Sequence, residues 1–152
     1  MAIIAVRRRG ALAAIFGLIA SAAAFADTET TYSFSWYVGQ TVTDFPAAIT
    51  LREGESGFSY ADFASADGSD LRVKDSGGNL LPHEIERWNT SGSSIVWVKM
   101  PSLSSSASVT LSWGDVDAPA ASGGVWDDDF LHVFHFGDDA KKNSSPWVYT
   151  TT

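Results

Sequence analysis

A short segment in the middle of the chain carries the side chains best suited to chemistry. Glu84, Glu86 and Trp88 occupy alternate positions there. Alternate side chains of a β-strand point to the same face, so the two carboxylates would lie roughly 6.5–7 Å apart. Glycosidases use two carboxylates about 5–5.5 Å or about 6.5–9.5 Å apart, and an indole ring can stack on a sugar.

The same spacing also occurs on any solvent-exposed sheet face. A tryptophan beside the two carboxylates favours binding more than it favours catalysis. We therefore predict that Glu84, Glu86 and Trp88 bind a ligand, and that the protein is not an enzyme and has no catalytic residues.

The acidic turn Asp67–Asp70 is the first candidate for a metal site. It does not fit a calcium-binding EF-hand loop, because placing Gly68 at the sixth position puts Phe63 at the first, where an oxygen ligand is required. An Asp-Gly turn capped by aspartate side chains explains the same residues.

Two histidines late in the chain are the second candidate for a metal site. His132 and His135 are three residues apart, so on a strand they would face opposite sides and could not chelate one ion. The acidic residues near them would need a larger folded domain to hold calcium. We expect neither a metal nor a cofactor.

Three strands in succession are predicted around the two glutamates. Apolar and basic residues alternate in Leu71–Lys74, alternate side chains of Leu81–Trp88 share a face, and Ile95–Met100 is rich in β-branched and aromatic residues. Glycine-containing turns separate these segments. We expect them to form an antiparallel meander that ends at Pro101, because proline cannot donate to a ladder.

Further strands are expected on both sides of this meander. They are Tyr32–Val38, Phe45–Leu51 and Val109–Trp113. Residues 58–66 are interpreted as a connection that places aromatic side chains under the sheets. Strands at this regular spacing predict an all-β fold for residues 27–115, an antiparallel β-sandwich of jelly-roll-like type.

Residues 116–124 are rich in Pro, Ala, Ser and Gly and are interpreted as a linker. A further strand is predicted at Phe130–Phe136. One strand cannot form a domain, so residues 125–152 either complete the sandwich or begin a second domain.

The N-terminus has the pattern of a secretory signal peptide. Three arginines at 7–9 precede an apolar run, and Ala24-Phe25-Ala26 forms a small-x-small cleavage site. Cleavage after Ala26 would leave 7 basic and 18 acidic residues, a formal net charge of −11. Such a surface repels nucleic acid and anionic membranes. We expect an extracytoplasmic protein whose fold, without cysteine, depends on its core.

Several of these segments resemble a known family. Asp44-Phe45-Pro46, Ala66–Arg72, Glu84–Trp88 and Val96–Pro101, followed by a closing strand, occur in the order found in the domain of unknown function 2341 family. The resemblance covers roughly residues 30–115. It implies an exported β-sandwich domain with no assigned activity.

That family often precedes a concanavalin A-like, laminin-G-like domain, and Val125–Phe136 looks like the start of one. It also occurs in the extracytoplasmic part of biopolymer-transport proteins of the TolQ/ExbB type. Nothing in this chain matches the helices of those proton channels.

Six tryptophans are many for a chain of this length, and we expect most of them in the core.

Three functions remain open. The first is a non-catalytic exported module that binds a glycan or an envelope or surface protein. The second is an extracytoplasmic spacer or sensor of a transport or envelope assembly. The third is a glycoside-active enzyme that uses Glu84 and Glu86.

Overall fold

The computed structural model of the protein describes residues 28–121, 123–136 and 143–147. The strands of this part of the chain are β1 (Thr28–Ser33), β2 (Val42–Arg52), β3 (Arg72–Lys74), β4 (His83–Arg87), β5 (Ser93–Leu103) and β6 (Ser108–Trp113). Two short 3-10 helices, η1 (Glu55–Gly57) and η2 (Tyr60–Asp62), lie between β2 and β3. The predicted signal peptide, residues 1–26, lies outside the described residues.

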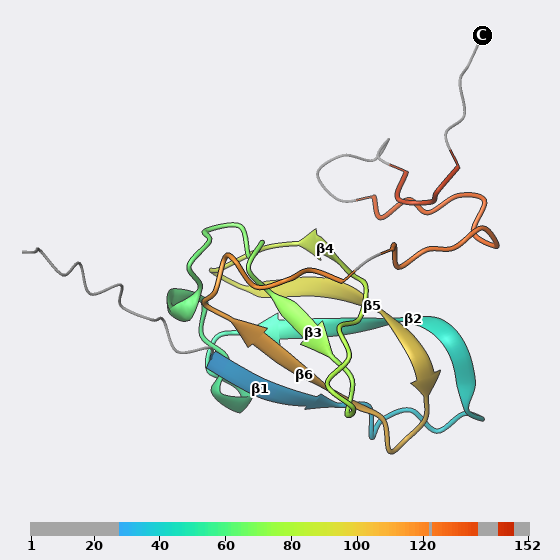
Figure 1. The fold of residues 1–152 in the computed structure, drawn as a ribbon, viewed down its shortest axis with the longest axis horizontal. Coiled ribbons are helices and arrows are strands. Elements are labelled where there is room, and N and C mark those ends of the chain that lie inside the picture. Colours follow the sequence, from blue (N-terminus) through green and yellow to red (C-terminus); the bar gives the residue numbers. More distant parts are fainter. Residues whose placement is uncertain (1–27, 122, 137–142, 148–152) are drawn as a thin grey trace, which may run out of the picture.

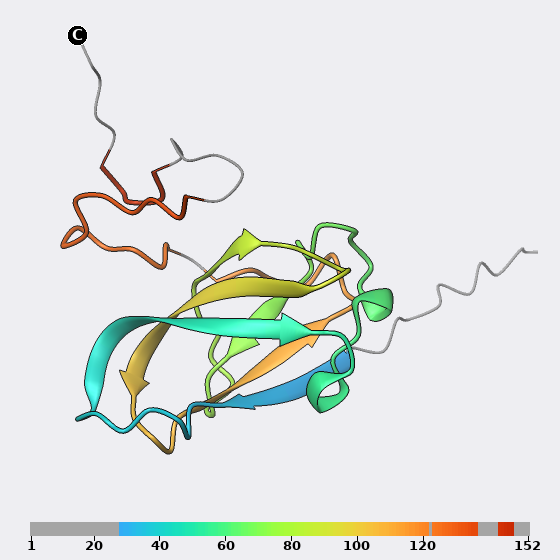
Figure 2. The same ribbon diagram turned by 180° about the vertical axis from the view of Figure 1, so that it is seen from behind.

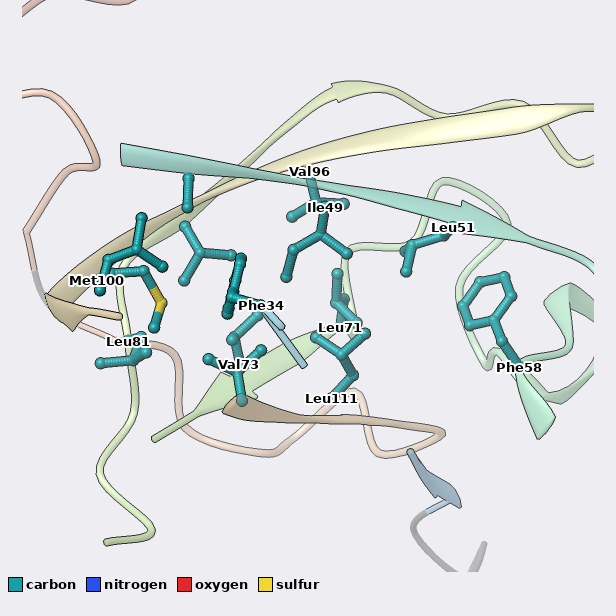
Figure 3. Packing of buried hydrophobic residues seen from close by; sticks show 14 of the residues in the cluster. Phe34, Ile49, Leu51, Phe58, Leu71, Val73, Leu81, Val96, Met100 and Leu111 are labelled. Carbon is teal, nitrogen blue, oxygen red and sulfur yellow. The ribbon is translucent and has the colours of Figure 1, made fainter. Parts of the chain in front are cut away.

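The strands form two antiparallel sheets, with the orders β1-β6-β3 and β2-β5-β4. Figure 1 shows the first sheet in front of the second, and Figure 2 shows the same two layers from behind. A cluster of buried apolar side chains fills the space between them (Figure 3). The predicted all-β sandwich is therefore confirmed.

The central strand β5 shows why the layers pack as they do. Val96 and Val98 are fully buried, whereas Ile95 and Trp97, which alternate with them along the strand, are only partly buried. Burying one such side chain contributes about 1.5–3 kcal/mol. The alternation therefore fixes which face of the sheet β2-β5-β4 meets the core and which face is left outside.

The predicted meander is wrong at its first strand. β3 pairs with β6 in one sheet, while β4 and β5 form a hairpin in the other. The chain crosses between the layers at Leu81, whose N–H donates to the carbonyl of Val73 at 2.8 Å before Pro82 leads into β4. Alternation within each strand is the same for either pairing, so it could not distinguish them.

Pro101 does not end β5, which continues to Leu103. The Lys99 N–H still donates to Pro82 at 2.9 Å on the side of β4. Pro101 lies two residues further along and faces the same side, beyond the start of β4 at His83. Its missing donor therefore costs no ladder hydrogen bond.

The first strand lies earlier than predicted. β1 ends at Ser33, and the chain then turns, with the Tyr37 N–H donating to Phe34 at 2.8 Å. Phe34 is fully buried, but Trp36 is 59% exposed and Val38 is exposed as well. The apolar pattern of Tyr32–Val38 therefore extends past the strand into a surface loop.

The aromatic connection between β2 and β3 is confirmed. Phe58 is buried, and Phe63 stacks on Trp113 with ring centroids 5.2 Å apart. Trp113 is the one tryptophan that is fully buried, so the expectation that most of the six lie in the core is wrong.

The segment after the linker contains no strand at Phe130–Phe136, contrary to prediction. One isolated bridge joins Phe134 to Asn143. Instead of pairing as a strand, the segment contacts the outer face of the sheet β2-β5-β4 through side chains.

Candidate functional site

The two glutamates are placed by a β-bulge in β4. Glu84 lies opposite Trp97 on the outer face of the sheet, and Ile85 lies opposite the buried Val96. The register then shifts, so that Arg87 lies opposite Ile95. Glu86 is the extra residue of this bulge. A bulge of one residue reverses the alternation that follows it.

Trp88 consequently points to the core side of the sheet. Its ring centroid lies 5.1 Å from that of Tyr60 and 4.9 Å from that of Phe63, and it packs against the buried cluster. The prediction that Glu84, Glu86 and Trp88 share one face is therefore wrong for Trp88, because uninterrupted alternation was assumed through the bulge.

Two other tryptophans take its place beside the carboxylates. The indole N–H of Trp97 donates to Glu86 Oε2 at 2.6 Å, and that of Trp126 donates to Glu84 Oε2 at 2.6 Å. The two indole ring centroids lie 5.2 Å apart. Trp97 belongs to β5, whereas Trp126 follows the linker.

His135 lies between the two carboxylates. Its Nδ1 is 3.3 Å from Glu86 Oε2, and its Nε2 is 3.5 Å from Glu84 Oε1. The side chains of His135, Glu84 and Glu86 are 14%, 21% and 17% exposed. We call Glu84, Glu86, Trp97, Trp126 and His135 the outer-face cluster.

Two further contacts hold the C-terminal segment, residues 123–136 and 143–147, on this face. Lys99 Nζ lies 3.1 Å from Asp127 Oδ2, and its hydrogen bond lowers the pKa of the Asp127 carboxyl. The Ser144 hydroxyl donates to Glu84 Oε1 at 2.5 Å. These contacts join β4 and β5 to residues between 28 and 60 positions later in the chain.

The chemistry available to the two glutamates follows from these contacts. Both carboxylates accept hydrogen bonds from indole N–H groups, and Glu84 also accepts one from Ser144. A substrate that used them as acid and base would have to displace these donors. These donors hold both carboxylates in place on the outer face of the sheet.

The acidic turn before β3 has a structural explanation. Asp67 accepts a hydrogen bond from the Ser69 N–H at 3.1 Å. The buried Asp70 accepts the N–H groups of Ala64 at 2.9 Å, Ser65 at 3.1 Å and Gly114 at 2.9 Å. The interpretation as a turn capped by aspartates is confirmed.

These contacts also shift the titration of both aspartates. The hydrogen bonds from Ser69 lower the pKa of Asp67. Burial by itself raises the pKa of Asp70, but the backbone N–H groups outweigh burial and lower it overall. Burial lowers the pKa of His83, and the nearby charge of Arg72 adds to this.

Other hollows of the described residues lie away from the two glutamates. A hollow of about 270 Å³ lies between the Asp75 turn and the serine-rich β5–β6 connection, away from both glutamates. Within the described ranges, no group of three or more His, Cys, Asp or Glu residues is placed to hold a metal ion. The same residues contain no helix with the length and apolarity of a membrane span.

Comparison with protein families gives one match. The family model of a domain of unknown function, DUF2341, matches residues 67–150. The chain belongs to the DUF2341 family. No curated protein and no solved structure matches it.

The DUF2341 match covers a different span from the resemblance seen in the sequence: it does not include residues 30–66, and it continues past residue 115 to residue 150. It begins in the Asp67 turn and includes Glu84, Glu86 and the C-terminal residues that contact them. The comparisons do not show the concanavalin A-like domain expected at residues 125–152.

Trp97, Trp126 and His135 were missed as members of the site. Trp97 could have been assigned to the outer face once Val96 and Val98 were assigned to the core. Trp126 and His135 carry no such signal, since they lie outside any strand and meet the glutamates only through the fold.

Proposed function

We propose that this DUF2341 chain is a non-catalytic, exported module that binds a surface protein. The supporting observation is the distribution of exposed apolar side chains. Half of the large ones lie in the C-terminal segment, and they are Leu131 (60% exposed), Phe134, Phe136 (75% exposed) and Trp147. The rings of Phe134 and Phe136 contact each other, with centroids 6.1 Å apart, and exposed apolar patches mark interaction surfaces.

The segment that carries them is held in place. Asn143 accepts the Val133 N–H at 2.9 Å and donates to the Trp147 carbonyl, and the Trp147 indole donates to the Asp128 carbonyl at 3.1 Å. Because the surface is ordered before a partner arrives, binding it loses less conformational entropy.

A protein suits this surface better than a glycan. Leu131 and Phe136 offer no hydrogen-bonding group, and a sugar needs polar partners beside an aromatic plane. An apolar protein patch needs no such partners.

Export is the part of the proposal that the N-terminal pattern supports. Sequencing of mature protein from the producing cells should begin at Asp27. Mature protein that retains Met1 would overturn export by cleavage.

Binding is tested on envelope fractions of the producing cells and on a panel of polysaccharides. We expect retention by the envelope fraction, loss of retention after protease treatment of that fraction, and no retention by polysaccharide. The double variant Leu131→Ser/Phe136→Ser should bind about tenfold or more weakly, the effect of losing anchor residues.

Val38→Ser is the matched control, because it removes an exposed apolar side chain from a different loop. It should bind like wild type. Polysaccharide retention would favour a glycan module. A folded protein retained by neither material would favour a spacer in an envelope assembly.

A further inference from the structure

The outer-face cluster has the form of a cage around one side chain. The indole rings of Trp97 and Trp126 have centroids 5.9 Å and 5.7 Å from that of His135. The carboxylates of Glu86 and Glu84 lie 3.3 Å and 3.5 Å from its two ring nitrogens. Aromatic faces within about 6 Å of a cation attract it, and cages of this kind bind organic cations.

The cage presents one carboxylate to each nitrogen of the ring that it encloses. A neutral imidazole has one donor and one acceptor nitrogen, whereas an imidazolium has two donors. Both nitrogens of His135 face carboxylate oxygens. A planar cation with an N–H on each side, such as an imidazolium or a guanidinium, matches this arrangement.

His135 does not fill the cage optimally. Its Nε2 is buried without a hydrogen-bond partner, although Glu84 Oε1 lies 3.5 Å away. A buried polar atom without a partner is unfavourable. A guanidinium has five N–H groups in one plane and can reach two carboxylates at once.

The geometry points to this cage as a binding site for a planar nitrogen cation, such as the guanidinium group of arginine, with the chain's own His135 as its resident occupant. The ligand enters when His135 leaves. The formal net charge of −8 for the whole chain also attracts cations. This inference does not depend on the exposed apolar surface proposed above, which consists of other residues.

The test is a titration of the full-length variant His135→Ala with methylguanidinium or imidazolium at constant ionic strength. We expect saturable shifts in the indole N–H resonances of Trp97 and Trp126, together with a rise in melting temperature. Wild type should bind about tenfold or more weakly, because its cage is open only part of the time.

Three controls separate charge from packing. Pyrazole, a neutral ring of the same size as imidazole, should give no saturable shift. The double variant His135→Ala/Glu86→Gln should lose most of the binding. His132→Ala changes a histidine of the same segment that stacks on Phe134, and it should behave like wild type.

An arginine tripeptide with blocked ends identifies the source of the cation. Binding of the peptide and of methylguanidinium assigns the cage to protein side chains as well as small cations, and binding of methylguanidinium alone restricts it to the latter. If His135→Ala does not fold, His135→Gln, which is closer in size to histidine and uncharged, takes its place. Absence of saturable shifts in a folded variant, or an equal response to pyrazole, would overturn the inference.

Discussion

Two charged residues, one in the turn before β3 and one at the start of β3, show how single side chains hold this fold. Asp70 and Arg72 are 1% and 8% exposed. Asp70 binds backbone N–H groups, and Arg72 donates all of its described hydrogen bonds to backbone carbonyls. Buried charges require such partners, so the motif that carries the family resemblance has a structural role.

Gly68 in the same turn is predicted not to tolerate a side chain. Its φ is +76°, and a Cβ would lie 2.7 Å from the Trp88 ring. Gly68→Ala should therefore lose about 1–3 kcal/mol more stability than Gly78→Ala. Gly78 is the matched control, since its φ is +81° and a Cβ would meet nothing within 4 Å. Urea unfolding measures both, and equal losses would show that Trp88 moves aside freely.

Asp70 is predicted to make stability depend on pH. Its pKa is lowered in the folded state, so its contribution is complete above the unfolded-state pKa of about 3.9 and is lost as the pH falls through the lower folded-state value. Asp70→Asn should lose about 1.5–3 kcal/mol at pH 7, the range for hydrogen bonds to a charged group.

The difference in the free energy of unfolding between wild type and Asp70→Asn should become smaller as the pH falls below about 3.9. Urea unfolding at several pH values measures it. The exposed Asp62→Asn is the control and should stay within about 0.5 kcal/mol of wild type. A gap independent of pH would show that the shape of the side chain matters rather than its charge.

At the scale of elements, the two faces of β4 and β5 have different roles in the sheet β2-β5-β4. The inner faces supply core residues such as Val96 and Ile85, and the outer faces supply Glu84, Glu86 and Trp97. The bulge at Glu86 lets one short strand place two carboxylates outside and still return Trp88 to the core. The site therefore depends on the register of this hairpin.

Val98→Asp should strongly destabilise the protein. Val98 is fully exposed in an unfolded chain but has no exposed surface here, so the variant would bury an unpaired carboxylate. We expect a loss of about 4 kcal/mol or more. Thr50→Asp, on an exposed position of β2, is the control and should change stability little. Similar melting temperatures for Val98→Asp and wild type would contradict the assignment of this face.

At the scale of the whole molecule, residues after β6 are tied back to the sandwich. Arg72 makes three of its five hydrogen bonds to the carbonyls of Ala118 and Pro119. Val125 is buried, and Trp126 reaches Glu84. The predicted linker at 116–124 is thus a segment with contacts of its own.

The effect of these ties can be measured by truncation. A chain of residues 27–115 should still melt cooperatively, because the buried cluster between the sheets ends at Trp113. It should be about 1–3 kcal/mol less stable than a chain of residues 27–121, which keeps the carbonyl partners of Arg72. Calorimetry of both measures the difference. An unfolded 27–115 chain would show that later residues complete the fold.

Much of the fold could be predicted from local patterns. The segments around β2, β5 and β6, the capped Asp67–Asp70 turn and the aromatic connection were all identified from residue type and spacing. These features depend on neighbours within a few residues, and their signal is carried by the segment itself. Part of the site was found in the same way, since Glu84 and Glu86 do lie on one outer face.

The tertiary structure decided the rest. Alternation is unchanged whichever strand a segment pairs with, so only the packed sheets assign β3 to β6 rather than to β4. A one-residue bulge leaves no mark on composition, yet it moves Trp88 to the core. His135 meets Glu84 and Glu86 across about fifty residues, a contact set by long-range packing. The sequence by itself determined most strands of the sandwich, and tertiary packing determined which side chains form the site.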